Sequence, residues 1–351
     1  MAVEKRVNEW SILRTVYDVS QFSEVRETER PDFLMMRNER DAHAFGVEVT
    51  ELFANQADAR AVNHPDYLPA LFAGAPHMHK DDPRLLPVAR MRLTDSDGNL
   101  KQEDLPGILT RTPSNAEHRR SLAAVIGAKS SRGYRVEDGH VNLIIRDRFF
   151  LSGETLNEEY SVTDLLSDGI REALIQSPFR EVFLISVAHN GQQVVRPLNQ
   201  LMLAERFFFF GKALEATINR PDMGGRSEYV QAFAEFCERE GEFGVDLKDH
   251  QGRPFAAYRS GAVGLCADLG MELLDFADRR VNLPPWDWQS GLEPLTDDEL
   301  ECCRRFVADN GFSWGYYGTP HEPAQLQFPN VRTVEVVEVP RNESPDGVHE
   351  R

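Results

Sequence analysis

Two mostly apolar runs constrain the fold of this chain most strongly. They cover residues 140–147 and 182–187, and residues 162–175 between them repeat apolar side chains at helical spacing. Runs that are apolar on both faces are typical of strands inside a sheet rather than at its edge. We therefore predict an α/β fold in which these strands lie centrally in a mixed sheet flanked by helices.

The first 52 residues predict a helix and then a β-hairpin. Apolar residues recur at helical spacing in the first segment, and two short apolar runs separated by a polar turn follow it. The expected elements are a helix over 2–18 and strands over 30–36 and 44–52.

Each of these three elements carries an acid where burial is expected. Glu9 shares the apolar stripe of the helix, Asp32 opens the first strand, and Glu48 lies in the middle of the second. A buried carboxylate is costly unless it is paired. A divalent cation would offset that cost, and two carboxylates on adjacent strands suit Mg²⁺. Alternatively the acids are structural, and Glu48 faces solvent on an edge strand.

The order of these features resembles the PD-(D/E)XK nuclease superfamily. The helix with Glu9, then Pro31-Asp32, then 46–50 with Glu48, then a further helix and strand follow one another as in that family. The resemblance covers residues 1–190 and implies a restriction-endonuclease-like mixed sheet flanked by helices. It also implies that Asp32 and Glu48 hold Mg²⁺, or Mn²⁺, with help from the Val49 carbonyl oxygen and from Glu9.

One position departs from the family pattern. Thr50 stands where the family has a lysine two residues after the second acid. Lys129 is the candidate replacement, because it lies at helical spacing from Leu122 and Ile126 on the buried face of the helix expected after Ser114. The alternative is that Lys129 extends outward near the helix end and its charge favours the helix dipole.

Charge bears on the partner that this fold would bind. The chain has 39 Lys and Arg against 57 Asp and Glu, a net charge of -18, which argues against non-specific coating of nucleic acid. Residues 111–135 form a local basic segment, from which Arg119, Arg120 and Arg132 are expected to contact a phosphate backbone. The same charges would also suit a solvated helix face.

Two functions are compatible with these residues. The resemblance implies a Mg²⁺-dependent nuclease that hydrolyses phosphodiester bonds of nucleic acid, with DNA ranked ahead of RNA as the substrate and bacterial defence or repair as the setting. The alternative is a catalytically inactive binding or regulatory protein that keeps the fold, which Thr50 and the acidic net charge favour. No phosphate-binding glycine loop, dinucleotide fingerprint or nucleophile elbow points to another enzyme class.

The remaining sequence predicts three further regions. Residues 54–113 form an insertion in the core with a short helix near 67–72, residues 191–340 form an α-rich C-terminal part, and 341–351 a polar tail. In the C-terminal part we expect helices over 198–217, 226–240, 262–279 and 297–309, and a strand over 333–339.

No apolar stretch predicts a membrane span or a signal peptide, and four scattered cysteines suit reduced thiols. We therefore expect a cytoplasmic protein without a membrane partner. The sequence sets no oligomeric state, and a homodimer is compatible with it.

Overall fold

The structure is a computed structural model of the 351-residue chain. It describes the following residues: 2–37, 45–94, 96, 99–108, 113–136, 139–149, 162–187, 192–217, 225–240, 243–266, 270–278, 282–287, 293–309, 315–317, 325–327 and 334–338. The expected polar tail lies outside them.

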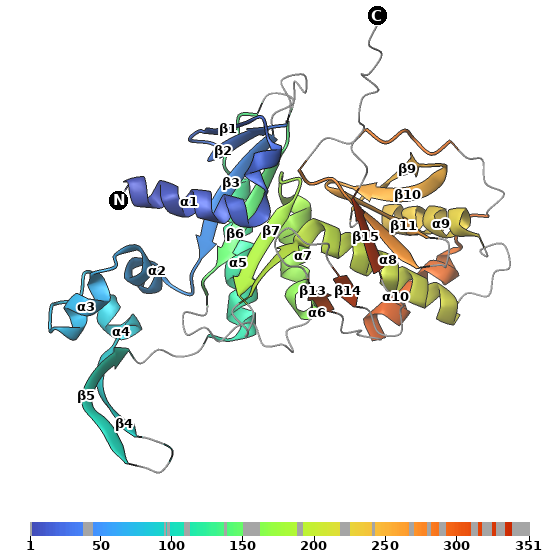
Figure 1. The fold of residues 1–351 in the computed structure, drawn as a ribbon. Coiled ribbons are helices and arrows are strands. Elements are labelled where there is room, and N and C mark those ends of the chain that lie inside the picture. Colours follow the sequence, from blue (N-terminus) through green and yellow to red (C-terminus); the bar gives the residue numbers. More distant parts are fainter. Residues whose placement is uncertain are drawn as a thin grey trace, which may run out of the picture.

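Within the described residues, six strands form a mixed sheet in the N-terminal half (Figure 1). Along the sheet the first two strand pairings are antiparallel, the next two are parallel, and the last is antiparallel. In sheet order they are β1 (Glu24–Glu27), β2 (Phe33–Met36), β3 (Phe45–Leu52), β6 (Val141–Asp147), β7 (Val182–Val187) and β8 (Gln193–Pro197). The prediction of a mixed α/β sheet with two central apolar strands is confirmed.

Helices cover both faces of this sheet. On one face, α1 (Ala2–Val16), followed by a 3-10 turn (Val19–Gln21), packs Ile12 and Leu13 against apolar side chains of β3 and β6. On the other face lie α5 (Asn115–Ser130), α6 (Val162–Leu165) and α7 (Asp168–Gln176). The single helix expected over 162–175 is therefore two helices.

The insertion projects from the sheet (Figure 1). Its helices α2 (Gln56–Asn63), α3 (Tyr67–Phe72) and α4 (Asp82–Leu85) enclose a small core of their own. The fully buried Asp82 accepts hydrogen bonds from Arg60 and from Tyr67 at its centre. A two-stranded ribbon, β4 (Val88–Thr94) and β5 (Leu100–Ile108), extends beyond these helices. The helix near 67–72 is confirmed, and the other elements were not predicted.

The C-terminal half contains a second sheet that the sequence analysis missed. Three predicted helices are confirmed as α8 (Leu198–Thr217), α9 (Arg226–Glu240) and α10 (Asp297–Asp309). Among the described residues, seven strands form the sheet, in the order β13 (Gly315–Tyr317), β14 (Gln325–Gln327), β15 (Val334–Glu338), β12 (Met271–Asp275), β11 (Gly261–Leu265), β10 (Arg253–Tyr258) and β9 (Asp246–His250). An α-rich description of this half is therefore incomplete.

The helix expected over 262–279 is wrong, and the late strand is confirmed as β15. Residues 261–265 and 271–275 form an antiparallel pair of strands instead. Gly264 explains part of the difference, because a Cβ built there would lie 2.8 Å from the ring of Phe255 on the neighbouring strand. The glycine thus permits close strand packing, which could not be predicted from its position in an apolar run.

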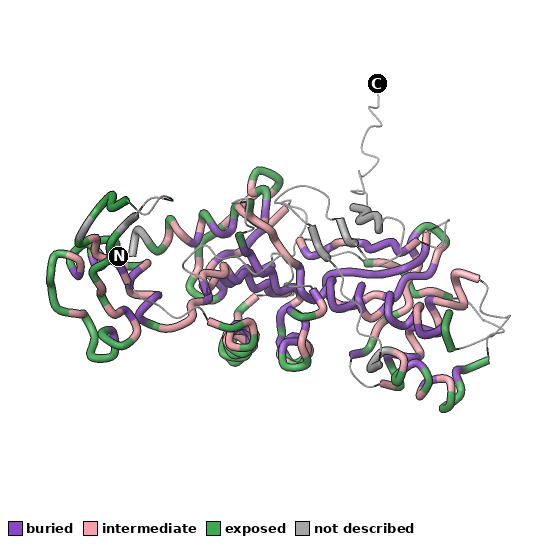
Figure 2. The backbone as a smooth tube through the Cα atoms, turned by 90° about the horizontal axis from the view of Figure 1, so that it is seen from below, coloured by how far each residue is buried: buried purple, intermediate pink, exposed green. Residues whose placement is uncertain are grey.

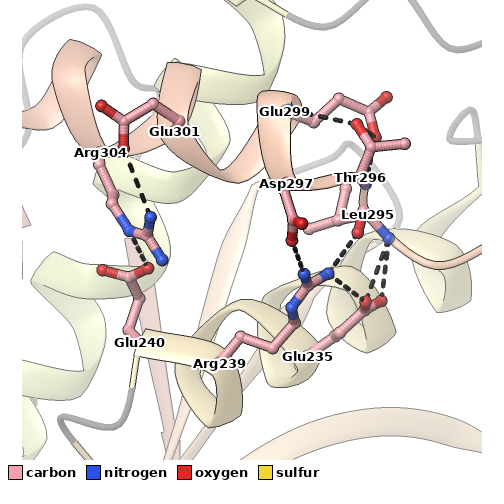
Figure 3. Close-up of polar contacts among 9 residues, drawn as sticks. All are labelled: Glu235, Arg239, Glu240, Leu295, Thr296, Asp297, Glu299, Glu301 and Arg304. Carbon is pink, nitrogen blue, oxygen red and sulfur yellow. Dashed lines mark hydrogen bonds and ion pairs between the residues drawn. The ribbon is translucent and has the colours of Figure 1, made fainter.

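Polar contacts fasten α10 to α9 (Figure 3). Glu235 accepts a hydrogen bond from the backbone N–H of Leu295 at 3.1 Å, and Arg239 bonds to Asp297. Thr296 and Glu299 exchange side-chain and backbone hydrogen bonds of 3.2 and 2.7 Å at the start of α10. These bonds satisfy free N–H groups where the helix begins and fix its position.

One hydrophobic core joins the two halves. It includes buried residues of α5, β6 and β7 and also of α8, β11 and β12. Figure 2 shows the buried backbone running continuously across the middle of the molecule. Among the described residues, no helix is both long and apolar enough to cross a membrane.

Candidate active site

Glu48 is buried on the α5 side of strand β3. Its neighbours Val47 and Val49 pack toward α1, so strand alternation turns Glu48 to the opposite face. The residue is 3% exposed, and β3 lies between β2 and β6. The alternative in which Glu48 faces solvent on an edge strand is therefore wrong.

Lys129 reaches Glu48 from the last turn of α5. Its Nζ donates to Glu48 Oε1 at 2.7 Å and to the Val49 carbonyl oxygen at 3.3 Å. The Lys129 side chain is only 11% exposed, so the alternative of an outward-pointing lysine is wrong. Leu122 and Ile126 on the same face of α5 are fully buried, which holds that face against the sheet.

Asp32 lies beside Glu48 through the register of the hairpin. Phe33 of β2 pairs with Val47 of β3, which places Asp32 next to Glu48 on the adjacent strand. Asp32 Oδ2 accepts a hydrogen bond of 2.9 Å from the backbone N–H of Val49. Two carboxylates and the Val49 carbonyl oxygen thus gather at one point of the sheet.

Burial and the neighbouring charged groups act on the pKa of Glu48. Burial raises the pKa of Glu48, the hydrogen bond from Lys129 lowers it, and the nearby charge of Asp32 raises it further. Arg132 adds a second cation, with NH1 3.3 Å from Glu48 Oε1. Both cations contact the same oxygen, and in the part of the chain that the structure describes Glu48 Oε2 is buried without a hydrogen-bond partner.

Glu9 is not brought into a group with these two acids. It is buried, as its place in the helix stripe predicted, but its oxygens pair with Lys5 at 3.3 Å and Arg6 at 3.4 Å on the same helix. Across the described ranges, no three His, Cys, Asp or Glu side chains gather as a metal-binding group. The oxygen groups that meet at this point of the sheet are therefore those of Asp32, Glu48 and the Val49 carbonyl.

The three arginines expected to contact phosphate lie in two places, one just past the end of α5 and the other near its start. Arg132 lies at the site, and its side chain remains 48% exposed. Arg119, which donates to the Asp164 carbonyl oxygen at 3.2 Å, and the exposed Arg120 lie near the helix start. At 1.5 Å per residue they are roughly 14 Å along the axis from Lys129. The structure does not place them in contact with Glu48.

Tyr134 is a site residue that the sequence analysis missed. Its hydroxyl donates to the Lys129 carbonyl oxygen at 2.9 Å, and its ring packs on Phe179, with the ring centres 5.6 Å apart. The contact holds the end of α5 that presents Lys129. Its only signal in the sequence is an aromatic residue just past a predicted helix end, where tertiary packing decides its partner.

Comparisons with protein-family models, curated proteins and solved structures found no match to this chain. The geometry of the site therefore carries the functional argument.

Proposed function

We propose that this protein is a divalent-metal-dependent nuclease with a restriction-endonuclease-like core. The observation that carries the proposal is the 2.7 Å contact between Lys129 Nζ and Glu48 Oε1, beside Asp32. A lysine, an aspartate and a glutamate from three separate elements form the side-chain set that the resemblance to PD-(D/E)XK nucleases implies. The lysine comes from α5 instead of position 50.

The donor set fits Mg²⁺ or Mn²⁺ in its chemistry. Asp32, Glu48 and the Val49 carbonyl supply hard oxygen ligands of the kind that Mg²⁺ prefers. The buried Glu48 Oε2 lacks a hydrogen bond among the described residues, and a cation would supply the missing partner. When bound, a divalent cation of this kind activates water and stabilises charge on a phosphoryl oxygen.

The residues of the chain would position the other reactants. Lys129, held between Glu48 and the Val49 carbonyl oxygen, would orient the attacking water through its ammonium group. The exposed part of Arg132 would contact a backbone phosphate next to the site, and Arg119 and Arg120 a phosphate further along α5. DNA is the proposed substrate ahead of RNA, with bacterial defence or repair as the setting.

One observation favours the second candidate, a nuclease-like binding or regulatory protein without catalysis. Lys129 and Arg132 already supply two positive charges to Glu48. A buried carboxylate with two cationic partners needs no metal for charge balance. In this case the protein would bind nucleic acid through the basic residues of α5 and leave it intact.

A cleavage panel separates the two candidates. Purified protein is incubated with plasmid, linear DNA, single-stranded DNA and RNA, in Mg²⁺, Mn²⁺ or EDTA. The nuclease proposal predicts cleavage in metal that EDTA abolishes, and the preferred substrate defines the specificity. Binding of nucleic acid without cleavage in either metal would favour the second candidate and contradict the first.

A further inference from the structure

Two arginines lie at the carboxyl end of the parallel strands, on the sheet face opposite Glu48. Arg146 occupies the penultimate position of β6, beside Glu51 of β3, and Arg148 follows the end of β6. Glu51 is three residues beyond Glu48, so strand alternation turns it toward α1. Ligands of open α/β sheets commonly bind at this edge, beyond the carboxyl ends of the strands.

Among the described residues, only Arg148 of the two arginines pairs with a carboxylate. Arg148 Nε pairs with Glu51 Oε1 at 2.5 Å, and Arg146 NH1 donates to Asn8 Oδ1 of α1 at 3.2 Å. Arg146 makes no ion pair within 4 Å among the described residues. The cluster therefore has two positive charges and one negative charge, while most N–H groups of both guanidinium groups make no hydrogen bond within the described residues.

The side chains of this cluster are partly removed from water. Arg146 and Arg148 are both partly buried, and the side chain of Arg148 is 29% exposed. Burial and the charge of Arg148 both lower the pKa of Arg146. Two neighbouring cations in partial burial repel each other, and an anion bound between them would offset this cost.

We infer that Arg146 and Arg148 form a binding site for a phosphate group, separate from the Glu48 site. Guanidinium groups bind phosphate oxygens through paired, charge-assisted N–H donors. Arg146 and Arg148 have such donors, since most of their N–H groups make no hydrogen bond in the part of the chain that the structure describes. The ligand is inorganic phosphate or a phosphate group carried by a nucleotide or oligonucleotide. This site does not depend on the nuclease proposal, because its residues lie on the other face of the sheet.

The test measures phosphate binding to the full chain by calorimetry, at constant ionic strength with chloride as the reference anion. Arg146→Gln and Arg148→Gln each remove one set of charged donors and should weaken binding at least roughly tenfold. Glu51→Gln removes the competing carboxylate and should strengthen it. Arg26→Gln, at an exposed arginine of β1 paired with Glu24 at 2.8 Å, is the matched control and should leave binding unchanged.

Opposite effects of the arginine and Glu51 substitutions are the decisive result, because simple damage to the fold would weaken binding in every variant. A 5′-phosphorylated and an unphosphorylated oligonucleotide, titrated in EDTA, identify the source of the phosphate. Three results would each overturn the inference: absence of phosphate binding to the parent protein, binding by both arginine variants as tight as that of the parent protein, or weaker binding by Glu51→Gln.

Discussion

Glu48 and Glu181 are both buried glutamates on strands or strand ends of the same sheet, yet their surroundings differ. Neutral donors satisfy both oxygens of Glu181: the backbone N–H groups of Val182 and Asn199 at 2.8 Å, that of Gln200 at 3.3 Å, and the hydroxyl of Ser260. Glu48 has two cations on one oxygen and, among the described residues, no hydrogen-bond partner on the other.

The two carboxylates differ in the kind of partners they have. Glu181 ties β7 to the start of α8 and to Ser260 between β10 and β11, so its bonds join the two sheets. All of these hydrogen bonds to Glu181 come from backbone N–H groups or from the Ser260 hydroxyl. Glu48 instead pairs with a lysine and an arginine, and in the proposal its other oxygen, which has no hydrogen-bond partner among the described residues, takes the metal. Burial is common to both acids, and the proposal that Glu48 is the functional one rests on the difference between their partners.

The largest expected effect is loss of cleavage in Asp32→Asn and Glu48→Gln. Both variants keep the side-chain shape and remove the charge that would hold the cation. Cleavage in Mg²⁺ should drop below detection, a larger fall than the roughly 10²–10⁴-fold typical of general acid–base groups. Plasmid cleavage at saturating DNA measures it.

The matched control for Glu48→Gln is Glu272→Gln. Glu272 is a buried glutamate on β12 whose oxygens pair with Arg253 at 2.6 and 3.1 Å, away from the proposed site. This variant loses the same kind of ion pair and should keep its cleavage. Equal loss in both variants would indicate general damage to the fold instead of a site.

The second prediction concerns Lys129→Met. The substitution keeps the apolar stem and removes the ammonium group, so turnover should fall by roughly 10²–10⁴-fold. The free energy of unfolding should also fall, by as much as about 3 kcal/mol, because Glu48 stays buried with one cation fewer. Turnover at saturating DNA and urea unfolding measure the two effects. Unchanged turnover would remove Lys129 from catalysis.

The third prediction uses pH and concerns Glu181. Burial raises the pKa of Glu181 from 4.5 to about 7 in the folded protein. Folding therefore favours the protonated form, and the stability gained at low pH is lost as pH rises from 4.5 through 7. The loss is up to about 3 kcal/mol of unfolding free energy. Burial also raises the pKa of Asp58, to about 6, so part of the fall should remain in Glu181→Gln. Urea unfolding across this range should show a fall in Glu181→Gln that is smaller than that of the parent protein by the Glu181 contribution.

Glu181→Gln should also leave cleavage unchanged, which sharpens the contrast with Glu48→Gln. A variant with the full pH dependence of the parent protein would show that Glu181 does not titrate in this range. A variant without cleavage would show that the junction between the sheets supports the site.

The site was predictable where local periodicity fixes the geometry. Glu48 was singled out as an acid in the middle of a predicted strand, and helical spacing from Leu122 and Ile126 placed Lys129 on the buried face of its helix, because the helix period determines which face a side chain occupies. Glu181 was not identified, since its partners Asn199 and Ser260 lie 18 and 79 residues away in the chain. Such contacts depend on tertiary packing that no local pattern specifies.

The fold was also predictable where a local sequence pattern determines the element. The apolar runs at 140–147 and 182–187 predicted the central strands correctly, because their composition and length are typical of buried strands. The strands at 261–265 and 271–275 were interpreted as one helix, since short apolar runs suit either element and the spacing between them also fits a helical stripe. Pairing with neighbouring strands decides between the two.

The smallest expected effect is that of Thr50→Val. Thr50 is partly exposed on β3, and its hydroxyl makes no hydrogen bond within the described residues. Because Lys129 occupies the role of the family lysine in the proposal, Thr50 contributes only strand packing, and cleavage should stay within a few-fold of the parent protein. A loss as large as that of Glu48→Gln would assign the hydroxyl a part in the reaction.

The most direct test of the account is the change in melting temperature that Mg²⁺ or Mn²⁺ produces in three proteins: the parent chain, Glu48→Gln and Glu181→Gln. A ligand that binds only the folded state raises the stability of that state, and the rise grows with the logarithm of the ligand concentration above Kd. We predict a metal-dependent rise in the parent protein and in Glu181→Gln, and none in Glu48→Gln. An equal rise in Glu48→Gln, or no rise in the parent protein, would contradict the assignment of Glu48 to a metal site.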